Sequence, residues 1–178
     1  VLFGCGKVGR GIAMYALLGG AELTVVDDAS RVKPPEGAVL VDFRDREAVE
    51  AALDGVWCVV SATGRAGALA GTFDMEKLAA GNALIANMGV EDEFGPELPA
   101  ERVLNRKAPL NFVLEEPTRL KYIDPTMALD NAGIPVLLAG GLPAGLVQPS
   151  PELEEKILDA VRKHGAVAPE LPLMEEFL

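Results

Sequence analysis

Three glycines near the start of the chain have a spacing that suits phosphate binding. Gly4, Gly6 and Gly9 form the pattern Gly-x-Gly-x-x-Gly. In such a loop the first glycine permits a tight turn, the second lets the backbone approach a pyrophosphate, and the third lets a helix pack closely on a strand. A helix that begins in the loop also directs free N–H groups and a partial positive charge toward the phosphates. The spacing therefore predicts a dinucleotide site.

The neighbouring sequence supplies the elements that such a loop needs. Residues 1–3 are apolar and predict a strand, and residues 12–17 carry apolar side chains at helical spacing until Gly19. Residues 22–26 predict a second strand, and Asp27 follows it at about the 20-residue distance that the pattern requires. A tight turn in an α/β fold without a ligand is the alternative interpretation. The complete context favours the dinucleotide site.

Asp27 predicts which dinucleotide binds. A carboxylate at the end of the second strand can accept hydrogen bonds from the ribose hydroxyls, and it repels a 2′-phosphate, so the sequence favours NAD over NADP. Ser30 and Arg31 are residues of a kind that holds a 2′-phosphate, and they keep NADP open as the alternative. We interpret Asp28 as a solvated loop charge.

Two further strand ends carry small polar residues. Thr63 and Gly64 follow a fourth apolar run, and Asn87, Met88 and Gly89 end a fifth. Open α/β sheets bind ligands at the carboxyl ends of their strands. The glycines would leave space beside a nucleotide, while the polar side chains offer hydrogen bonds to a ribose or a carboxamide. Ordinary turn chemistry is an equally good interpretation of these residues taken alone.

The order of elements predicts a doubly wound α/β domain with a parallel sheet, because apolar strands alternate with helical stretches. The expected strands after the first two cover 38–41, 56–60 and 83–86, and Asp45 and Asp74 are expected to start the helices between them. We assign residues 1–109 to a dinucleotide-binding core and residues 110–178 to an extension of the same domain.

The extension is expected to be less regular than the core. Short strands are predicted over 110–114, 120–123 and 135–139, with a short helix between Asp124 and Gly133. A charged amphipathic helix is predicted to follow Ser150 and to end near residue 164.

Composition excludes several classes of function. The chain has 178 residues, a net charge of −11, two cysteines and one histidine. An acidic protein repels nucleic acid and anionic membranes, so we expect neither as a partner. Cys5 and Cys58 lie far apart without a metal-binding spacing, which predicts no metal site and a reducing, cytoplasmic location. The chain starts at Val1, inside the first expected strand, which we interpret as a piece of a longer protein.

No catalytic acid or base can be named from the sequence, so the catalytic residues stay unknown. His164 suits the end of a helix, where a cation is favoured. The charged segment 115–124 contains Lys121 and Tyr122, which could move a proton beside a nicotinamide, but a solvated hairpin explains the charges equally well. Met14 and Trp57 lie in apolar runs and are expected to pack in the core.

The motifs together resemble the NAD-binding domain of the S-adenosylhomocysteine hydrolase family. The family's Gly-x-Gly-x-Val-Gly-x-Gly loop is matched by Gly4, Gly6, Val8, Gly9 and Gly11. Similar elements are found at residues 61–64 for Thr-Thr-Thr-Gly, at residues 87–90 for Asn-Ile-Gly-His and at residues 136–141 for a later strand and turn. Val90 stands where the family has His, and Gly145 stands where it has a later Asn.

The resemblance implies a tightly held NAD that transiently oxidises the ribose of a small nucleoside substrate. It places Gly6, Lys7 and Val8 along the pyrophosphate, Asp27 on the adenosine ribose, and Thr63 beside the other ribose. Residues 87–89 would then lie near the nicotinamide. In the family the substrate domain precedes this one, so we expect such a domain in the longer protein, and we expect the tail 174–178 to contact a second subunit of a homo-oligomer.

Two alternatives remain open. The chain could be a regulatory NAD(H) sensor without catalysis, since the cytosolic domains of potassium channels have a similar glycine loop and strand-end Asp. The enzyme hypothesis itself also includes a dehydrogenase that acts on another substrate class. The second alternative is a fold that has lost nucleotide binding and uses its acidic second half for protein contacts.

Overall fold

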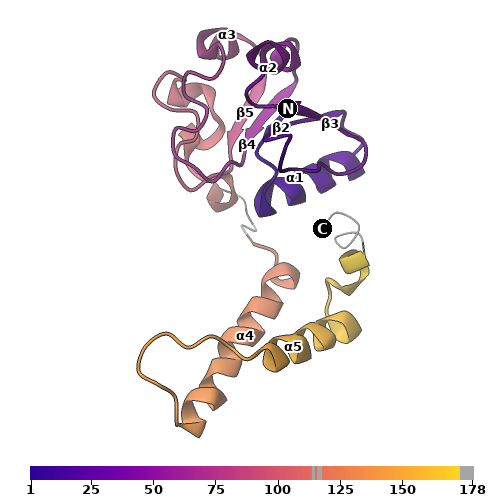
Figure 1. Cartoon of the computed structure of the whole chain (residues 1–178), viewed down its shortest axis with the longest axis vertical. Coiled ribbons are helices and arrows are strands. Elements are labelled where there is room, and N and C mark those ends of the chain that lie inside the picture. Colours follow the sequence, from indigo (N-terminus) through magenta and orange to yellow (C-terminus); the bar gives the residue numbers. More distant parts are fainter. Residues whose placement is uncertain (114, 116–117, 173–178) are drawn as a thin grey trace. The chain divides into compact units, whose positions relative to one another are not determined.

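A computed structural model describes residues 1–113, 115 and 118–172 of the chain (Figure 1). The chain divides into two compact units between Leu114 and Glu115. The predicted division into a core over 1–109 and an extension over 110–178 stays a prediction.

The first unit is built on a five-stranded parallel sheet, as predicted. The strand order is β3-β2-β1-β4-β5, so the chain winds outward from β1 in both directions (Figure 1). This arrangement creates a switch point between β1 and β4, where open α/β sheets bind ligands. The strands are β1 (Leu2–Phe3), β2 (Leu23–Asp27), β3 (Ala38–Asp42), β4 (Cys58–Ser61) and β5 (Leu84–Asn87).

Helices cover both faces of the sheet. The helices are α1 (Lys7–Leu18), α2 (Arg46–Leu53) and α3 (Met75–Ala80). Successive residues of β1 point to opposite faces. Leu2 packs in a cluster with Ala13 of α1, and Phe3 packs in a second cluster that includes residues of α2 and α3. The doubly wound α/β fold predicted from the sequence is therefore confirmed.

The helix starts in this unit follow the expected capping chemistry. Asp45 accepts a hydrogen bond from the N–H of Ala48, and Asp74 accepts one from the N–H of Lys77. Met14 is buried, as predicted. Trp57, predicted to lie in the core, is instead 76% exposed, because β4 begins only after it, at Cys58.

The second unit is helical, and the short strands predicted for it are wrong. Helix α4 (Leu120–Ala139) spans both 120–123 and 135–139, and it contains the short helix expected between them. Residues 110–113, also predicted as strand, form the 3-10 helix η3 (Leu110–Val113), while residue 114 lies outside the described residues. Short apolar runs do not distinguish strands from helices, and α4 continues through both Pro125 and Pro135.

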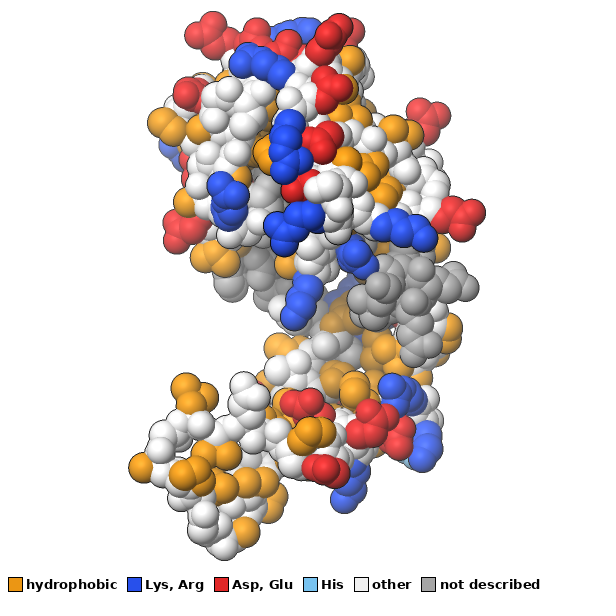
Figure 2. Space-filling view, viewed as in Figure 1, with side chains coloured by type: hydrophobic (Ala, Val, Ile, Leu, Met, Phe, Trp, Pro, Cys, Tyr) orange, Lys and Arg blue, Asp and Glu red, His pale blue; other side chains and the backbone are white. Residues whose placement is uncertain are grey.

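The last predicted helix is confirmed as α5 (Pro151–His164), which Ser150 caps through the N–H of Leu153. Apolar side chains gather over the end of α4 and the loop that follows it (Figure 2), where Leu138 is 82% exposed. Among the described residues, no helix combines the length and the apolar character that crossing a membrane requires.

Candidate functional site

A cavity of about 630 Å³ opens at the carboxyl edge of the sheet in the first unit. Its volume falls in the usual range of about 300–1,000 Å³ for small-molecule sites. The glycine loop, the end of β2 and the segment after β4 all line it, through Gly4, Gly6, Asp27 and Thr63 among others. The structure thus brings together residues that the sequence analysis selected from three separate motifs.

The structure requires glycine at two of the three positions of the loop, and for a different reason at each. Gly4 has a φ of +91°, and a Cβ there would lie 2.5 Å from the carbonyl oxygen of Ala62. A Cβ on Gly9 would overlap the carbonyl of Gly4. Gly6 has an ordinary φ of −72°, and a Cβ there would meet nothing within 4 Å. The fold itself requires Gly4 and Gly9, whereas it leaves the space beside Gly6 open.

The N-terminus of α1 lies in this loop without a side-chain cap. Gly6 is the N-cap residue, and the first turn carries no acidic residue. Helices α2, α3 and α5 each receive a side-chain hydrogen bond at this end, whereas α1 and α4 receive none. The first N–H groups of a helix have no partner within the helix. In α1, which begins with Lys7 and Val8, these N–H groups can therefore donate hydrogen bonds to a bound anion.

Asp27 ties the glycine loop to the end of β2. Its two carboxylate oxygens accept hydrogen bonds from the N–H groups of Cys5 and Asp28, each at 2.6 Å. A carboxylate oxygen can accept more than one hydrogen bond. Asp27, which also lines the cavity, therefore keeps acceptor capacity for a hydroxyl group of a ligand.

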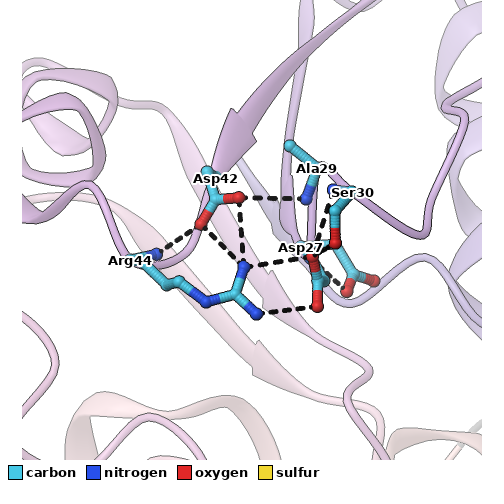
Figure 3. A network of polar contacts seen from close by, with 6 residues as sticks. Asp27, Ala29, Ser30, Asp42 and Arg44 are labelled. Atoms are coloured by element: carbon cyan, nitrogen blue, oxygen red, sulfur yellow. Dashed lines mark hydrogen bonds and ion pairs between the residues drawn. The ribbon is translucent and has the colours of Figure 1, made fainter.

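Asp28 is not the solvated loop charge that we interpreted from the sequence. Its side chain is only 16% exposed and pairs with Arg44, which follows β3. Ser30 also donates to it, and the hydrogen bonds from Arg44 and Ser30 hold the pKa of Asp28 well below its ordinary value. Figure 3 shows Arg44 lying between the ends of β2 and β3, where it also contacts Asp42.

A buried carboxylate that the sequence analysis missed organises the segment after β4. Glu93 is 1% exposed, and its oxygens accept hydrogen bonds from the N–H groups of Thr63 at 2.8 Å and Gly64 at 2.6 Å. A Cβ on Gly89 would overlap this carboxylate. The absence of a side chain at Gly89 therefore makes room for a protein carboxylate, a role that its position at a strand end did not reveal.

Asn87 connects three segments at the end of β5. It is fully buried, and its Oδ1 accepts hydrogen bonds from the hydroxyl of Ser61 and the N–H of Glu93. Its Nδ2 lies within hydrogen-bonding distance of the carbonyls of Gly89, Glu91 and Lys107. Its predicted contact with a cofactor stays a prediction, as do those of Met88, which packs partly buried against a core cluster, and Gly89.

A turn at residues 105–107, with an unfavourable backbone conformation, holds the loop that follows β5. Asn105, Arg106 and Lys107 all have positive φ values, of 50°, 52° and 71°. Such conformations are costly for residues other than glycine and persist where the surroundings enforce them. The ammonium group of Lys107 contacts Asp92 at 2.8 Å and the carbonyl of Gly95 at 2.6 Å, which fixes the loop that carries Glu93. No pattern in the sequence predicted this turn.

The remaining candidates belong to the second unit or are chemically unsuited. Burial raises the pKa of the Cys5 thiol, so this side chain is a poor nucleophile at neutral pH. His164 lies in the last turn of α5. Lys121 and Tyr122 lie in α4, so the alternative of a hairpin is wrong for these residues, and both contact Glu170 within the second unit. Glu116, in the same charged segment, lies outside the described residues. The described residues contain no cluster of His, Cys, Asp and Glu that could hold a metal ion.

A second cavity, of about 700 Å³, lies beside Trp57 and Ala83, at the amino ends of β4 and β5. None of the predicted cofactor-binding residues lines it. The cavity at the glycine loop is therefore the better candidate, because it unites the motifs at the edge where α/β sheets bind ligands. In the comparisons with known proteins, no family model, no curated protein and no solved structure matches the chain.

Proposed function

We propose that the first unit binds a dinucleotide, with NAD preferred over NADP. The observation that carries the proposal is the open space beside Gly6, because neither the backbone conformation nor the packing of the protein requires glycine there. The uncapped start of α1 and the carboxylate of Asp27 border the same cavity. A pyrophosphate beside Gly6 and a ribose on Asp27 account for all three features.

The proposed placement follows the order of the strands. The adenosine half lies over the ends of β1 and β2, with Asp27 on the ribose hydroxyls. Lys7 and Val8 contribute the first N–H groups of α1 to the pyrophosphate. The nicotinamide half then lies beyond the switch point, beside Thr63 and the loops after β4 and β5, whose positions Glu93 and Asn87 fix. Bound NAD would supply a hydride acceptor there.

The proposed class is the NAD-binding part of an enzyme, similar to the S-adenosylhomocysteine hydrolase family, which oxidises and reduces a small-molecule substrate. The described residues that line the cavity include two carboxylates but no His, Lys or Tyr. We place Asp27 on the ribose, and Asp28 is paired with Arg44, so an acid or base for catalysis would come from another part of the protein. The same observation favours the second candidate, a regulatory NAD(H) sensor without catalysis. Exchangeable rather than tightly held NAD distinguishes the sensor from the enzyme.

The test is a substitution that leaves the fold intact and fills the open space. In Gly6→Ser, serine is at least as good an N-cap residue as glycine, and its hydroxyl accepts from the free N–H groups of α1. We expect unchanged or slightly raised stability together with a loss of NAD affinity of about tenfold or more, the scale of lost hydrogen bonds to a charged group.

Gly11→Ala is the matched control. A Cβ on Gly11 would likewise meet nothing within 4 Å, but this glycine lies within α1 rather than at its start. Although it matches the last glycine of the family's loop, it is not among the residues that line the cavity. Alanine there should stabilise the helix by about 1 kcal/mol and leave the NAD affinity unchanged. Equal NAD affinity in wild type, Gly6→Ser and Gly11→Ala, measured by calorimetric titration, would refute the proposed pyrophosphate site.

A further inference from the structure

We infer that Asp28 is a second determinant of cofactor choice, because its carboxylate occupies the place that the 2′-phosphate of NADP would take. The inference rests on the proposed dinucleotide site and deepens it. Asp27 alone disfavours a 2′-phosphate by its charge. Asp28 excludes the phosphate in a second way, because its carboxylate already accepts the hydrogen bonds that Arg44 and Ser30 would otherwise donate to a phosphate.

The donors around Asp28 form a complete anion site. The two terminal nitrogens of Arg44 approach the two oxygens of Asp28 at 3.0 Å and 2.8 Å, which is a bidentate pair. Ser30 adds its N–H at 3.0 Å and its hydroxyl at 2.6 Å, both to the same oxygen. A guanidinium fork, a backbone N–H and a hydroxyl are the groups that bind phosphate oxygens in proteins.

The position of this anion site suits the 2′ substituent. Asp28 lines the cavity directly beside Asp27, which we place on the adenosine ribose. Arg31 lines the cavity as well and adds a second positive charge near the same place. Figure 3 shows that Arg44 reaches this place from the end of β3, where Asp42 also contacts it at 3.3 Å. Arg44 would therefore keep an anchor if Asp28 were removed.

Removing the Asp28 carboxylate should accordingly convert an internally filled anion site into one that accepts a ligand phosphate. In Asp28→Ala a negative charge is lost beside the ribose, and the donors of Arg44 and Ser30 become available. A charge-assisted pair with phosphate corresponds to a gain in affinity of roughly tenfold or more. NAD lacks the 2′-phosphate, so its affinity should change little.

The experiment compares ligands that differ in the 2′-phosphate. Wild type, Asp28→Ala and Asp28→Ala/Arg44→Ala are titrated calorimetrically with NAD, NADP, 5′-ADP and 2′,5′-ADP. We expect Asp28→Ala to gain affinity of about tenfold or more for NADP and 2′,5′-ADP alone. The double variant should lose this gain, because it lacks the guanidinium. Asp28→Ser, whose shorter side chain also leaves the place of the carboxylate open, replaces Asp28→Ala if the latter does not fold.

The outcomes separate this inference from the proposed function. If wild type binds NAD and the Asp28 variants gain nothing for 2′,5′-ADP, the inference is wrong and the dinucleotide site stands. A gain that persists in the double variant also overturns it, since Arg44 would then not be the phosphate partner. If wild type binds none of the four ligands, the proposed function fails and the inference fails with it.

Discussion

Replacing Glu93 tests whether one buried carboxylate holds the segment after β4. The carboxylate is 1% exposed and accepts two backbone hydrogen bonds, from Thr63 and Gly64. Hydrogen bonds to a charged group contribute about 1.5–3 kcal/mol each, and a buried donor without a partner costs about 1–3 kcal/mol. Glu93→Ala leaves both donors unpaired and opens a void. We therefore expect it to lower the free energy of unfolding of the first unit by about 3–5 kcal/mol.

Glu93→Gln gives a graded version of the same experiment. The amide keeps the volume of the side chain, but it has one acceptor oxygen and turns an NH₂ group toward the second donor. The expected loss is about 1–3 kcal/mol. Glu97→Gln is the matched control, because Glu97 also accepts one backbone hydrogen bond, from Gly71 at 3.1 Å, but at an exposed position. Its expected loss is below about 1 kcal/mol.

Urea unfolding measures these differences. Circular dichroism follows this unfolding, because Trp57, the single tryptophan of the chain, is already 76% exposed in the folded first unit and would change its fluorescence little. The expected order of stability is wild type, Glu97→Gln, Glu93→Gln and Glu93→Ala, from highest to lowest. If both Glu93 variants unfold within about 0.5 kcal/mol of Glu97→Gln, the carboxylate does not hold this segment and the reasoning is refuted.

Three further predictions concern the glycine loop and its acidic neighbours. Gly9→Val should reduce stability and NAD binding together, because its side chain would overlap the carbonyl of Gly4, and normal melting and normal affinity would show that the close packing of α1 is unimportant. Asp27→Ala should weaken NAD binding by about 1.5–3 kcal/mol in a calorimetric titration, since it removes acceptors for the ribose and also releases the N–H of Cys5. Unchanged affinity would contradict the placement of the ribose. The pKa of Asp28 is lowered in the folded protein, so its stabilising contribution should be complete above its unfolded pKa of about 3.9 and decline as the pH falls further. In urea unfolding, the stability difference between wild type and Asp28→Asn should therefore be constant from about pH 8 to 5 and shrink below about pH 4, and a difference that grows on acidification would show the opposite sign of the shift.

The first unit could be predicted from the sequence because its signals are local. The glycine loop, the strand-end Asp27 and the helix caps at Asp45 and Asp74 each depend on residues a few positions apart. The second unit was predicted less well, since the apolar runs within 120–139 carry no period that distinguishes strand from helix. Trp57 was misplaced for a similar reason, because the run that contains it extends beyond the strand itself.

The sequence could indicate only those residues of the candidate site that belong to a recognisable motif within one segment. It could not indicate contacts between distant segments. The pairing of Glu93 with Thr63 and Gly64 joins residues about 30 positions apart, and a glutamate in a polar loop gives no signal of burial. The pairing of Asp28 with Arg44 likewise depends on the neighbouring ends of β2 and β3. Such contacts follow from the packing of strands, so they became visible only in the folded chain.

Binding of nicotinamide dinucleotides by the wild-type chain tests the central claim most directly. NAD, NADH, NADP and NADPH are titrated calorimetrically under identical buffer and salt. The account predicts saturable binding of NAD or NADH with one site per chain and weaker binding of the two phosphorylated forms, because Asp27 and Asp28 disfavour a 2′-phosphate. Binding of none of the four, or a preference for NADP or NADPH, would contradict it.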